Sequence, residues 1–168
     1  QKSGAFDDEI SAVEIKTRKG AVTVANDEQP ASARPDKIPQ LTPAVREGGT
    51  VTAANSSSIS DGAAALVLAS ADAAKAKGLT IRAKIKGHAS HAQAPGLFTT
   101  APVPAAHKLL AQIGWKKEDV DLWEVNEAFA VVPLAFMHEM GLSHDIVNGK
   151  GGAWAPGHPI GASGARIR

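Results

Sequence analysis

The sequence contains no cysteine, which excludes disulfide bonds, thiolate metal sites and a cysteine nucleophile within these 168 residues. It also lacks an excess of charge of either sign, because 18 Lys and Arg stand against 17 Asp and Glu, a net charge of +1. Such a balance gives no field that would hold a nucleic acid or an anionic membrane by electrostatics alone. We therefore expect neither partner.

Long apolar runs are missing as well. No stretch approaches the roughly 20 residues needed to cross a bilayer, and residues 1–15 lack the basic region and apolar core of a secretory signal. We therefore expect a cytoplasmic protein, with an organellar matrix as the open alternative. The apolar content of 43% and the charged content of 21% are typical of an ordered globular chain.

The first fifty residues predict a hairpin and a connector. Residues 9–16 alternate imperfectly and residues 21–24 are apolar and partly β-branched, with a turn at residues 18–20 between them. Four prolines then fall between Pro30 and Pro43. Proline interrupts helices and central strands, so this stretch is expected to form a loop or an extended surface connector.

After residue 50, apolar runs that favour strands alternate with segments of helical spacing. The expected strands are 51–53 (a strand end), 63–69 (buried on both faces), 81–86, 120–125 and 146–147. The expected helices run from the cap Ser70 to the stop Gly78, from Pro104 to the stop Gly114, and from Glu127 to Met140. This alternation predicts a layered α/β architecture.

Three histidines lie near one another in the sequence, at His88, His91 and His107. A metal site needs three or four ligands at fixed geometry, and no cysteine or carboxylate cluster accompanies these residues. We therefore predict no metal here.

Asn126 falls where a predicted strand ends and a predicted helix begins. One interpretation is a helix cap, because an Asn side chain satisfies a free amide of the first turn. The other is a functional amide at the carboxyl end of a strand, where ligands of layered α/β folds bind. The residue alone leaves both open.

The segment 151–164 holds five glycines, two prolines and one imidazole, that of His158. Glycines at this density let the backbone approach a ligand closely, and Pro159 restricts His158 to an extended conformation. A helix opening near Ser163 would aim free amides toward anything bound beside the ring. A plain glycine-rich turn is the alternative, while a phosphate-cradling loop is not, because no GK[ST] follows.

The strings at residues 126–129 and 157–166 resemble two signature motifs of the thiolases. Four further stretches resemble thiolase sequence in the same order: residues 4–10, 27–28, 50–55 and 61–65. The resemblance spans nearly the whole chain. It implies a thiolase-like layered α-β-α fold, present only as a partial chain.

The resemblance also implies three parts. Residues 1–59 would be the end of the loop domain, with the hairpin, the proline-rich connector and a coenzyme A-contacting segment. Residues 60–80 would be the last strand and helix of the N-terminal core domain, and residues 81–168 the first part of the C-terminal core domain.

Thiolases make or cleave carbon–carbon bonds between acyl groups carried on coenzyme A, through a cysteine acyl-enzyme and a second cysteine that moves a proton. The resemblance implies acetyl-CoA condensation to acetoacetyl-CoA or thiolysis of 3-ketoacyl-CoA. The resemblance implies that His158 activates the nucleophile and donates a hydrogen bond to the thioester oxygen. It also implies that Asn126 holds a water that completes the oxyanion hole. Preorganised donors of this kind are worth roughly 3–4 kcal/mol each.

Ser57 matches a serine that contacts the pantetheine arm of coenzyme A, and Ala53, Ala128 and Phe129 match residues that line the same tunnel. Without the resemblance, Ser57 is equally a hydroxyl that caps its own loop. The resemblance implies no cofactor and no metal, because coenzyme A and acyl-CoA are substrates. It implies a homodimer or a homotetramer.

The chain departs from the family in three ways. Both reactive cysteines fall outside it, so we expect a fragment or remainder of a polypeptide of more than twice this length, inactive alone. Ala31 stands where an arginine often touches the nucleotide end of the coenzyme. Lys150, Trp154 and Pro156 stand where thiolases usually carry an asparagine and aliphatic residues.

Two other functions remain open at this point. One is a non-catalytic module that binds acyl-CoA without chemistry. The other is a thiolase-like scaffold kept for subunit contact.

Overall fold

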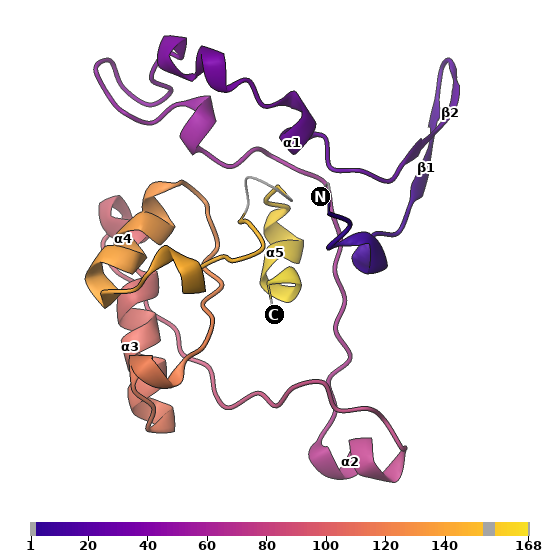
Figure 1. Ribbon diagram of the computed structural model, residues 1–168, viewed down its shortest axis with the longest axis vertical. Helices are drawn as coiled ribbons and strands as arrows, with labels where there is room; N and C mark the ends of the chain where they lie inside the picture. Colours follow the sequence, from indigo (N-terminus) through magenta and orange to yellow (C-terminus); the bar gives the residue numbers. More distant parts are fainter. Residues whose placement is uncertain (1–2, 153–156, 168) are drawn as a thin grey trace.

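The computed structural model describes residues 3–152 and 157–167. Within that range the sheet consists of one antiparallel hairpin, formed by β1 (Val13–Thr17) and β2 (Gly20–Val24) (Figure 1). Val13 pairs with Val24 and Thr17 with Gly20, so the turn has two residues. Gly20 has a φ of +119°, a value that glycine adopts readily. The predicted hairpin is confirmed, and every residue of its two strands is exposed.

The proline-rich stretch is exposed, as predicted, and holds two short helical pieces. These are α1 (Gln29–Ser32) and the 3-10 helix η2 (Pro35–Gln40). A proline occupies the first turn of each, where the missing N–H costs nothing. A further 3-10 turn, η1 (Asp7–Glu9), precedes the hairpin.

Helices α2 (Ala71–Ala76) and α3 (Pro102–Ile113) form close to where their caps predict them. The Ser70 hydroxyl accepts the Ala73 amide at 3.2 Å and opens α2. Gly114, with a φ of +72°, ends α3 in the left-handed conformation that commonly terminates helices. The predicted helices are confirmed, although α3 begins two residues before Pro104.

Helix α4 (Val131–Met140) is shorter than predicted at its start. Residues 128–130 are instead held by an earlier segment: the Ala130 amide donates to the Asn55 carbonyl at 3.0 Å, and Ser56 pairs with Phe129 in an antiparallel bridge. The Ala130 amide and the Ala128 carbonyl therefore bond to residues 55–57 rather than along a helix. The N-cap is Ala130, so the interpretation of Asn126 as a helix cap is wrong.

The predicted strands 120–125 and 146–147 lie side by side, as a single parallel bridge between Trp123 and Val147. The Trp123 amide donates to the Ile146 carbonyl at 2.8 Å, and the Asn148 amide donates to the Trp123 carbonyl at 2.8 Å. Helix α4 connects the two segments, which is the arrangement of a short βαβ unit. The unit places Asn126 at the carboxyl end of its first strand segment.

The hydrophobic core lies between this unit and α3. Its buried members are Val125, Val132, Phe136, Met140 and Val147. Partly buried side chains of α3, among them Val103, Ala106 and Leu110, pack against them. The two helices stand next to each other in Figure 1.

The expected strands at 51–53, 63–69 and 81–86 are not formed in the described residues. Residues 53–55 are instead a 3-10 turn, η3 (Ala53–Asn55). The other two segments run extended in Figure 1, with exposed side chains such as Val67 (93%) and Ile85 (62%). A strand needs a neighbour to pair its backbone groups, and the described part of the chain supplies none to these segments.

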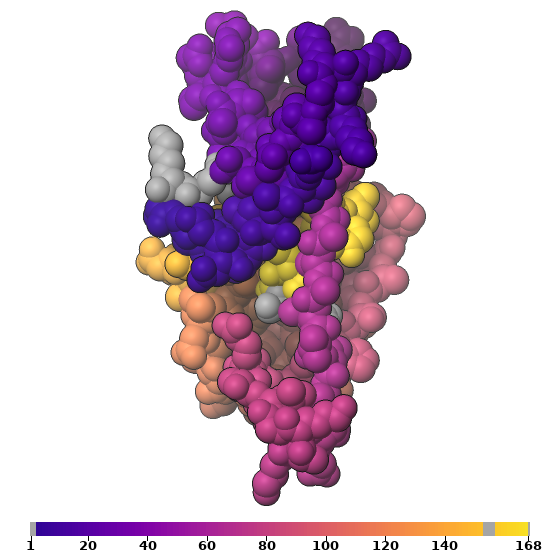
Figure 2. All heavy atoms as spheres, turned by 90° about the vertical axis from the view of Figure 1, so that its right-hand side faces the viewer, coloured from indigo at the N-terminus to yellow at the C-terminus, as the bar shows by residue number. Residues whose placement is uncertain are grey.

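Residues 60–62 pass beside residues 157–159. A Cβ on Gly62 would lie 2.6 Å from the Pro159 Cγ, and one on Gly157 would lie 2.5 Å from the Ser60 Oγ. In Figure 2 this extended segment crosses in front of α5 (Ile160–Arg166). None of the helices within residues 3–152 and 157–167 has the length and apolar character that a membrane-spanning helix needs.

Candidate functional site

Asn126 and His158 meet across 32 positions of sequence. The Asn126 Nδ2 lies 3.3 Å from the His158 Nε2, and both residues are half-buried. Asn126 follows the Trp123 bridge, and His158 directly precedes the proline that caps α5. Local sequence places each residue at the end of its own element, and the fold brings the two side chains together.

The other ring nitrogen of His158 is also engaged. His158 Nδ1 lies 2.7 Å from the Ser163 Oγ, and the Ser163 hydroxyl donates to the Pro159 carbonyl at 3.2 Å. Ser163 is 7% exposed, in the first turns of α5. The imidazole is thus held at both nitrogens, which fixes the plane of the ring.

Asn148 holds the residues on either side of Asn126. Its Oδ1 accepts the Val125 amide at 2.7 Å, and its Nδ2 donates to the Val125 carbonyl at 2.9 Å and to the Glu127 Oε1 at 2.8 Å. The sequence reasoning missed this residue. The dipeptide Asn148-Gly149 was the available signal, since Asn before Gly favours positive φ, and Asn148 has a φ of 52°.

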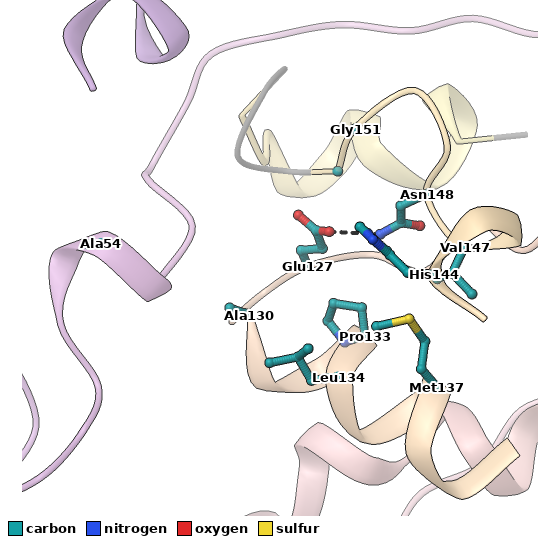
Figure 3. A pocket seen from close by; sticks show the side chains of 11 residues that line it. Ala54, Glu127, Ala130, Pro133, Leu134, Met137, His144, Val147, Asn148 and Gly151 are labelled. Carbon is teal, nitrogen blue, oxygen red and sulfur yellow. Dashed lines mark hydrogen bonds between the residues drawn. The ribbon is translucent and has the colours of Figure 1, made fainter. Parts of the chain in front are cut away.

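Glu127 and Asn148 also form the polar corner of a cavity of about 440 Å³ (Figure 3). Most of its lining is apolar, and α4 contributes Pro133, Leu134 and Met137. A Cβ on Gly152 would overlap the Glu127 carboxylate, so glycine is the residue that fits there.

A second cavity, of about 300 Å³, lies beside Asn126 and Ser163. Four charged residues, each from a different segment, line it: Glu9, Glu124, Lys150 and Arg166. Partial burial raises the pKa of the Glu124 carboxyl above its ordinary value, and the negative charge of Glu127 raises it further. Of the three departures near the histidine, Lys150 lines this cavity, while Trp154 and Pro156 lie outside the described residues.

Three of the four residues matched to the coenzyme A tunnel are brought together. The Ser57 hydroxyl donates to the Ala128 carbonyl at 3.0 Å, and the Ser57 amide donates to the same oxygen at 3.1 Å. Phe129 follows directly and packs edge to face on Phe98, with ring centroids 6.0 Å apart. Ala53 is exposed in η3, on the segment that leads to Ser57.

The histidines of residues 88–107 are not arranged as a metal site. His91 Nε2 lies 3.1 Å from the Gln93 Oε1, and its Nδ1 lies 3.0 Å from the Lys108 Nζ. Over residues 3–152 and 157–167, no group of three or more potential ligands is positioned to hold a metal ion.

Two family models match the chain. Residues 1–72 match the thiolase N-terminal domain, and residues 79–168 match the thiolase C-terminal domain. An acetyl-CoA acetyltransferase from Yarrowia lipolytica is 52% identical over 166 residues, which cover 99% of this chain and 42% of that protein. The chain therefore spans less than half the length of the curated relatives it matches.

Solved structures of thiolases also match this chain over nearly its whole length. The acetyl-CoA acetyltransferase of Bacillus anthracis matches with a TM-score of 0.92 at 44% identity, covering 99% of this chain and 42% of that one. An Acat5 thiolase from Ascaris suum, solved in complex with coenzyme A, matches with a TM-score of 0.85 at 39% identity, with the same coverage. The expected α/β fold of a partial thiolase chain is confirmed, and this chain belongs to the thiolase family.

Proposed function

We propose that the protein carrying this chain is a thiolase-type acetyl-CoA C-acyltransferase. It condenses acetyl-CoA to acetoacetyl-CoA or cleaves 3-ketoacyl-CoA, by way of a cysteine acyl-enzyme. The observation that carries the proposal is the approach of Asn126 to His158 at 3.3 Å, in a chain whose fold is that of acetyl-CoA acetyltransferases. The reacting cysteines would come from outside these 168 residues, which contain none.

His158 has the chemistry that the first step needs. A neutral imidazole takes the proton of the cysteine thiol, and the thiolate then attacks the thioester carbonyl, forming a carbon–sulfur bond. The carbonyl π electrons move to oxygen, and the collapse of that oxyanion expels the coenzyme A thiolate, which recovers the proton. A protonated His158, together with a water held by Asn126, donates hydrogen bonds to the oxygen while it is charged.

Residues 55–57 and the residues 128–130 that they contact supply a site for the slender pantetheine arm of coenzyme A. In this proposal Ser57 contacts the pantetheine, and Ala53, Ala128 and Phe129 line its tunnel, where small side chains leave room. The support is the contact of Ser57 with Ala128 at 3.0 Å and the likeness to an Acat5 thiolase solved with coenzyme A. Coenzyme A thioesters are substrates here, and no separate cofactor enters.

The same proposal divides the chain at residues 60 and 81, into the end of a loop domain, the end of an N-terminal core domain and the start of a C-terminal core domain. The docking of residues 55–57 on residues 128–130 supports this order, because a loop segment packs there on a core segment. The enzyme is proposed to be cytoplasmic and to act as a homodimer or homotetramer.

A segment exchange tests the proposal. This chain replaces the matching 42% of the Yarrowia lipolytica acetyl-CoA acetyltransferase, which keeps its own remaining residues. We expect the chimera to cleave acetoacetyl-CoA with free coenzyme A and to form a labelled acyl-enzyme from acetyl-CoA. The chain purified alone should do neither.

The same chimera separates the enzyme from a non-catalytic binding module. A folded chimera that binds coenzyme A but forms no acyl-enzyme would show that these residues bind without supporting chemistry. Loss of coenzyme A binding as well would point to a scaffold. Either result would refute the proposed acyltransferase.

A further inference from the structure

A row of hydrogen bonds runs through the His158 ring and ends at a backbone carbonyl. From one end to the other, its members are the Asn126 amide, the two imidazole nitrogens, the Ser163 hydroxyl and the Pro159 carbonyl. The three contacts measure 3.3, 2.7 and 3.2 Å. Ser163 is buried, so water does not compete for its hydroxyl.

The proton positions in this row follow from the chemistry of its ends. A carbonyl oxygen only accepts, so the single hydroxyl proton of Ser163 points at Pro159. The Ser163 oxygen is then an acceptor toward the ring, and His158 Nδ1 must carry the hydrogen that reaches it.

The opposite end of the row leads to the same assignment independently. The Asn126 Nδ2 only donates, so the nitrogen facing it, His158 Nε2, presents a lone pair. A neutral imidazole has one N–H, and both ends place it on Nδ1. The partner of one ring nitrogen commonly decides what the other nitrogen can do.

We propose that Ser163 is a positioning residue that holds neutral His158 in its Nδ1–H tautomer, so that Nε2, whose lone pair faces the Asn126 amide, is the basic nitrogen of the ring. This rests on the proposed function only for its consequence in catalysis. There, Nε2 takes the thiol proton, and the same Nε2–H then faces the oxyanion. Nδ1–H stays on Ser163 throughout, so one ring orientation serves both steps.

Nitrogen-15 NMR tests the tautomer without reference to activity. The protein is labelled with 15N-histidine and examined at a pH where the ring is neutral, and His158→Gln identifies the two ring signals. We expect Nδ1 to show the protonated shift and Nε2 the unprotonated one. Ser163→Ala should shift the balance toward Nε2–H, while Ser163→Thr, which keeps the hydroxyl, should retain Nδ1–H.

Ser32→Ala is the matched control, because the Ser32 hydroxyl also donates to a carbonyl within its helix, that of Gln29, at 3.1 Å, far from any histidine in sequence. It should leave the His158 signals unchanged. A wild-type spectrum dominated by Nε2–H would overturn the inference even if Ser163→Ala failed to fold. So would a folded Ser163→Ala protein that retains Nδ1–H.

Kinetics of the acyl-transferring chimera give the second readout. We expect Ser163→Ala to lower kcat by roughly 10- to 100-fold, the scale of removing a partner that orients an active-site histidine, with KM little changed. Ser163→Thr should restore most of the rate. If His158→Ala leaves the rate unchanged while the NMR result holds, the proposed function fails and the tautomer assignment stands.

Discussion

The Asn148 side-chain amide forms two hydrogen bonds with the Val125 backbone: its oxygen accepts the Val125 N–H at 2.7 Å, and its nitrogen donates to the Val125 carbonyl at 2.9 Å. This is the pattern that one strand residue offers another, supplied here by a side chain. The same amide donates to Glu127, so the residues before and after Asn126 are both fixed. The position of the Asn126 side chain therefore depends on a residue 22 positions away that touches no substrate in the proposed mechanism.

Replacing Asn148 by Ala should destabilise the protein by roughly 2–4 kcal/mol. Val125 would lose two buried hydrogen bonds and Glu127 a partly buried one, and Ala would have to adopt a φ of 52°. Urea unfolding measures the loss. Asn148→Gly separates the two causes, because it removes the amide but tolerates the backbone, and it should be about 1 kcal/mol milder. Equal stability of wild type and Asn148→Ala would show that the hydrogen bonds of Asn148 do not stabilise the fold.

Gly152→Ala should destabilise the protein by roughly 1–3 kcal/mol, because the new Cβ would displace the Glu127 carboxylate from Asn148. Gly149→Ala is the matched control on the same loop, where a Cβ meets nothing within 4 Å. Thermal unfolding of both variants checks the difference. If Gly149→Ala lowers the stability as much as Gly152→Ala does, then the loop backbone, and not the Glu127 carboxylate, is what requires glycine at residue 152.

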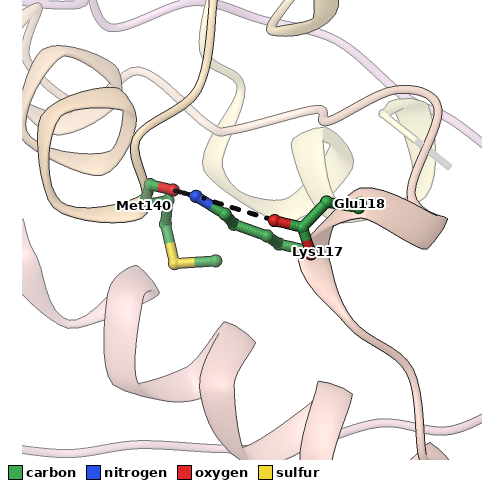
Figure 4. A network of polar contacts seen from close by, with 3 residues as sticks. All are labelled: Lys117, Glu118 and Met140. Atoms are coloured by element: carbon green, nitrogen blue, oxygen red, sulfur yellow. Dashed lines mark hydrogen bonds and ion pairs between the residues drawn. The ribbon is translucent and has the colours of Figure 1, made fainter.

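Lys117 stabilises the end of α4 by donating to the Met140 carbonyl at 2.7 Å, where a cation also meets the negative end of the helix dipole (Figure 4). Its ion pair with Glu118 is long, at 4.0 Å, and both side chains are exposed. We expect Lys117→Ala to cost about 1 kcal/mol in urea unfolding, and Glu118→Ala to change little. A larger loss of stability in Glu118→Ala than in Lys117→Ala would show that the ion pair, and not the bond to Met140, stabilises this end of the helix.

Glu124 predicts a pH dependence of stability. Its pKa is raised in the folded state, by partial burial first and by Glu127 second, so the folded protein binds this proton more tightly than the unfolded chain. Stability then falls as pH rises from the usual glutamate pKa, about 4.3, through the raised one. Glu124→Gln removes the charge and should raise Tm at pH 7, a gain that fades below about pH 4.

Glu14→Gln, the same change on the exposed strand β1, is the control for Glu124→Gln. A gain in Tm at pH 7 that persists unchanged at pH 3 would contradict the electrostatic origin.

Elements set by local chemistry were predicted well from the sequence. The hairpin follows from a two-residue turn between apolar runs, and α2 and α3 follow from Ser70 and Gly114 at their ends. Residues 63–69 were predicted as a strand because they form an apolar run, and residues 81–86 because apolar and cationic residues alternate there. Apolar character does not create a pairing partner, and no described residue pairs with them.

The site shows the same division. Residue chemistry alone left Asn126 between a helix cap and a functional amide, and only the docking of residues 55–57 decides that α4 starts later. The resemblance to thiolases identified Asn126 and His158 as a pair. Asn148 and Ser163 hold that pair in place. The Asn-Gly dipeptide at residues 148–149 indicates a turn, but the contacts that these two residues make become visible only in the fold.

The central claim is that Asn126 and His158 act on one oxygen of a thioester. A double-mutant cycle in the chimera tests it, with kcat for acetoacetyl-CoA thiolysis measured for Asn126→Ala, His158→Ala and the double variant. Each single change should lower kcat by roughly 10²- to 10³-fold, and the double variant should be little worse than the poorer single one. Effects that multiply, or a single variant with the wild-type rate, would contradict the account.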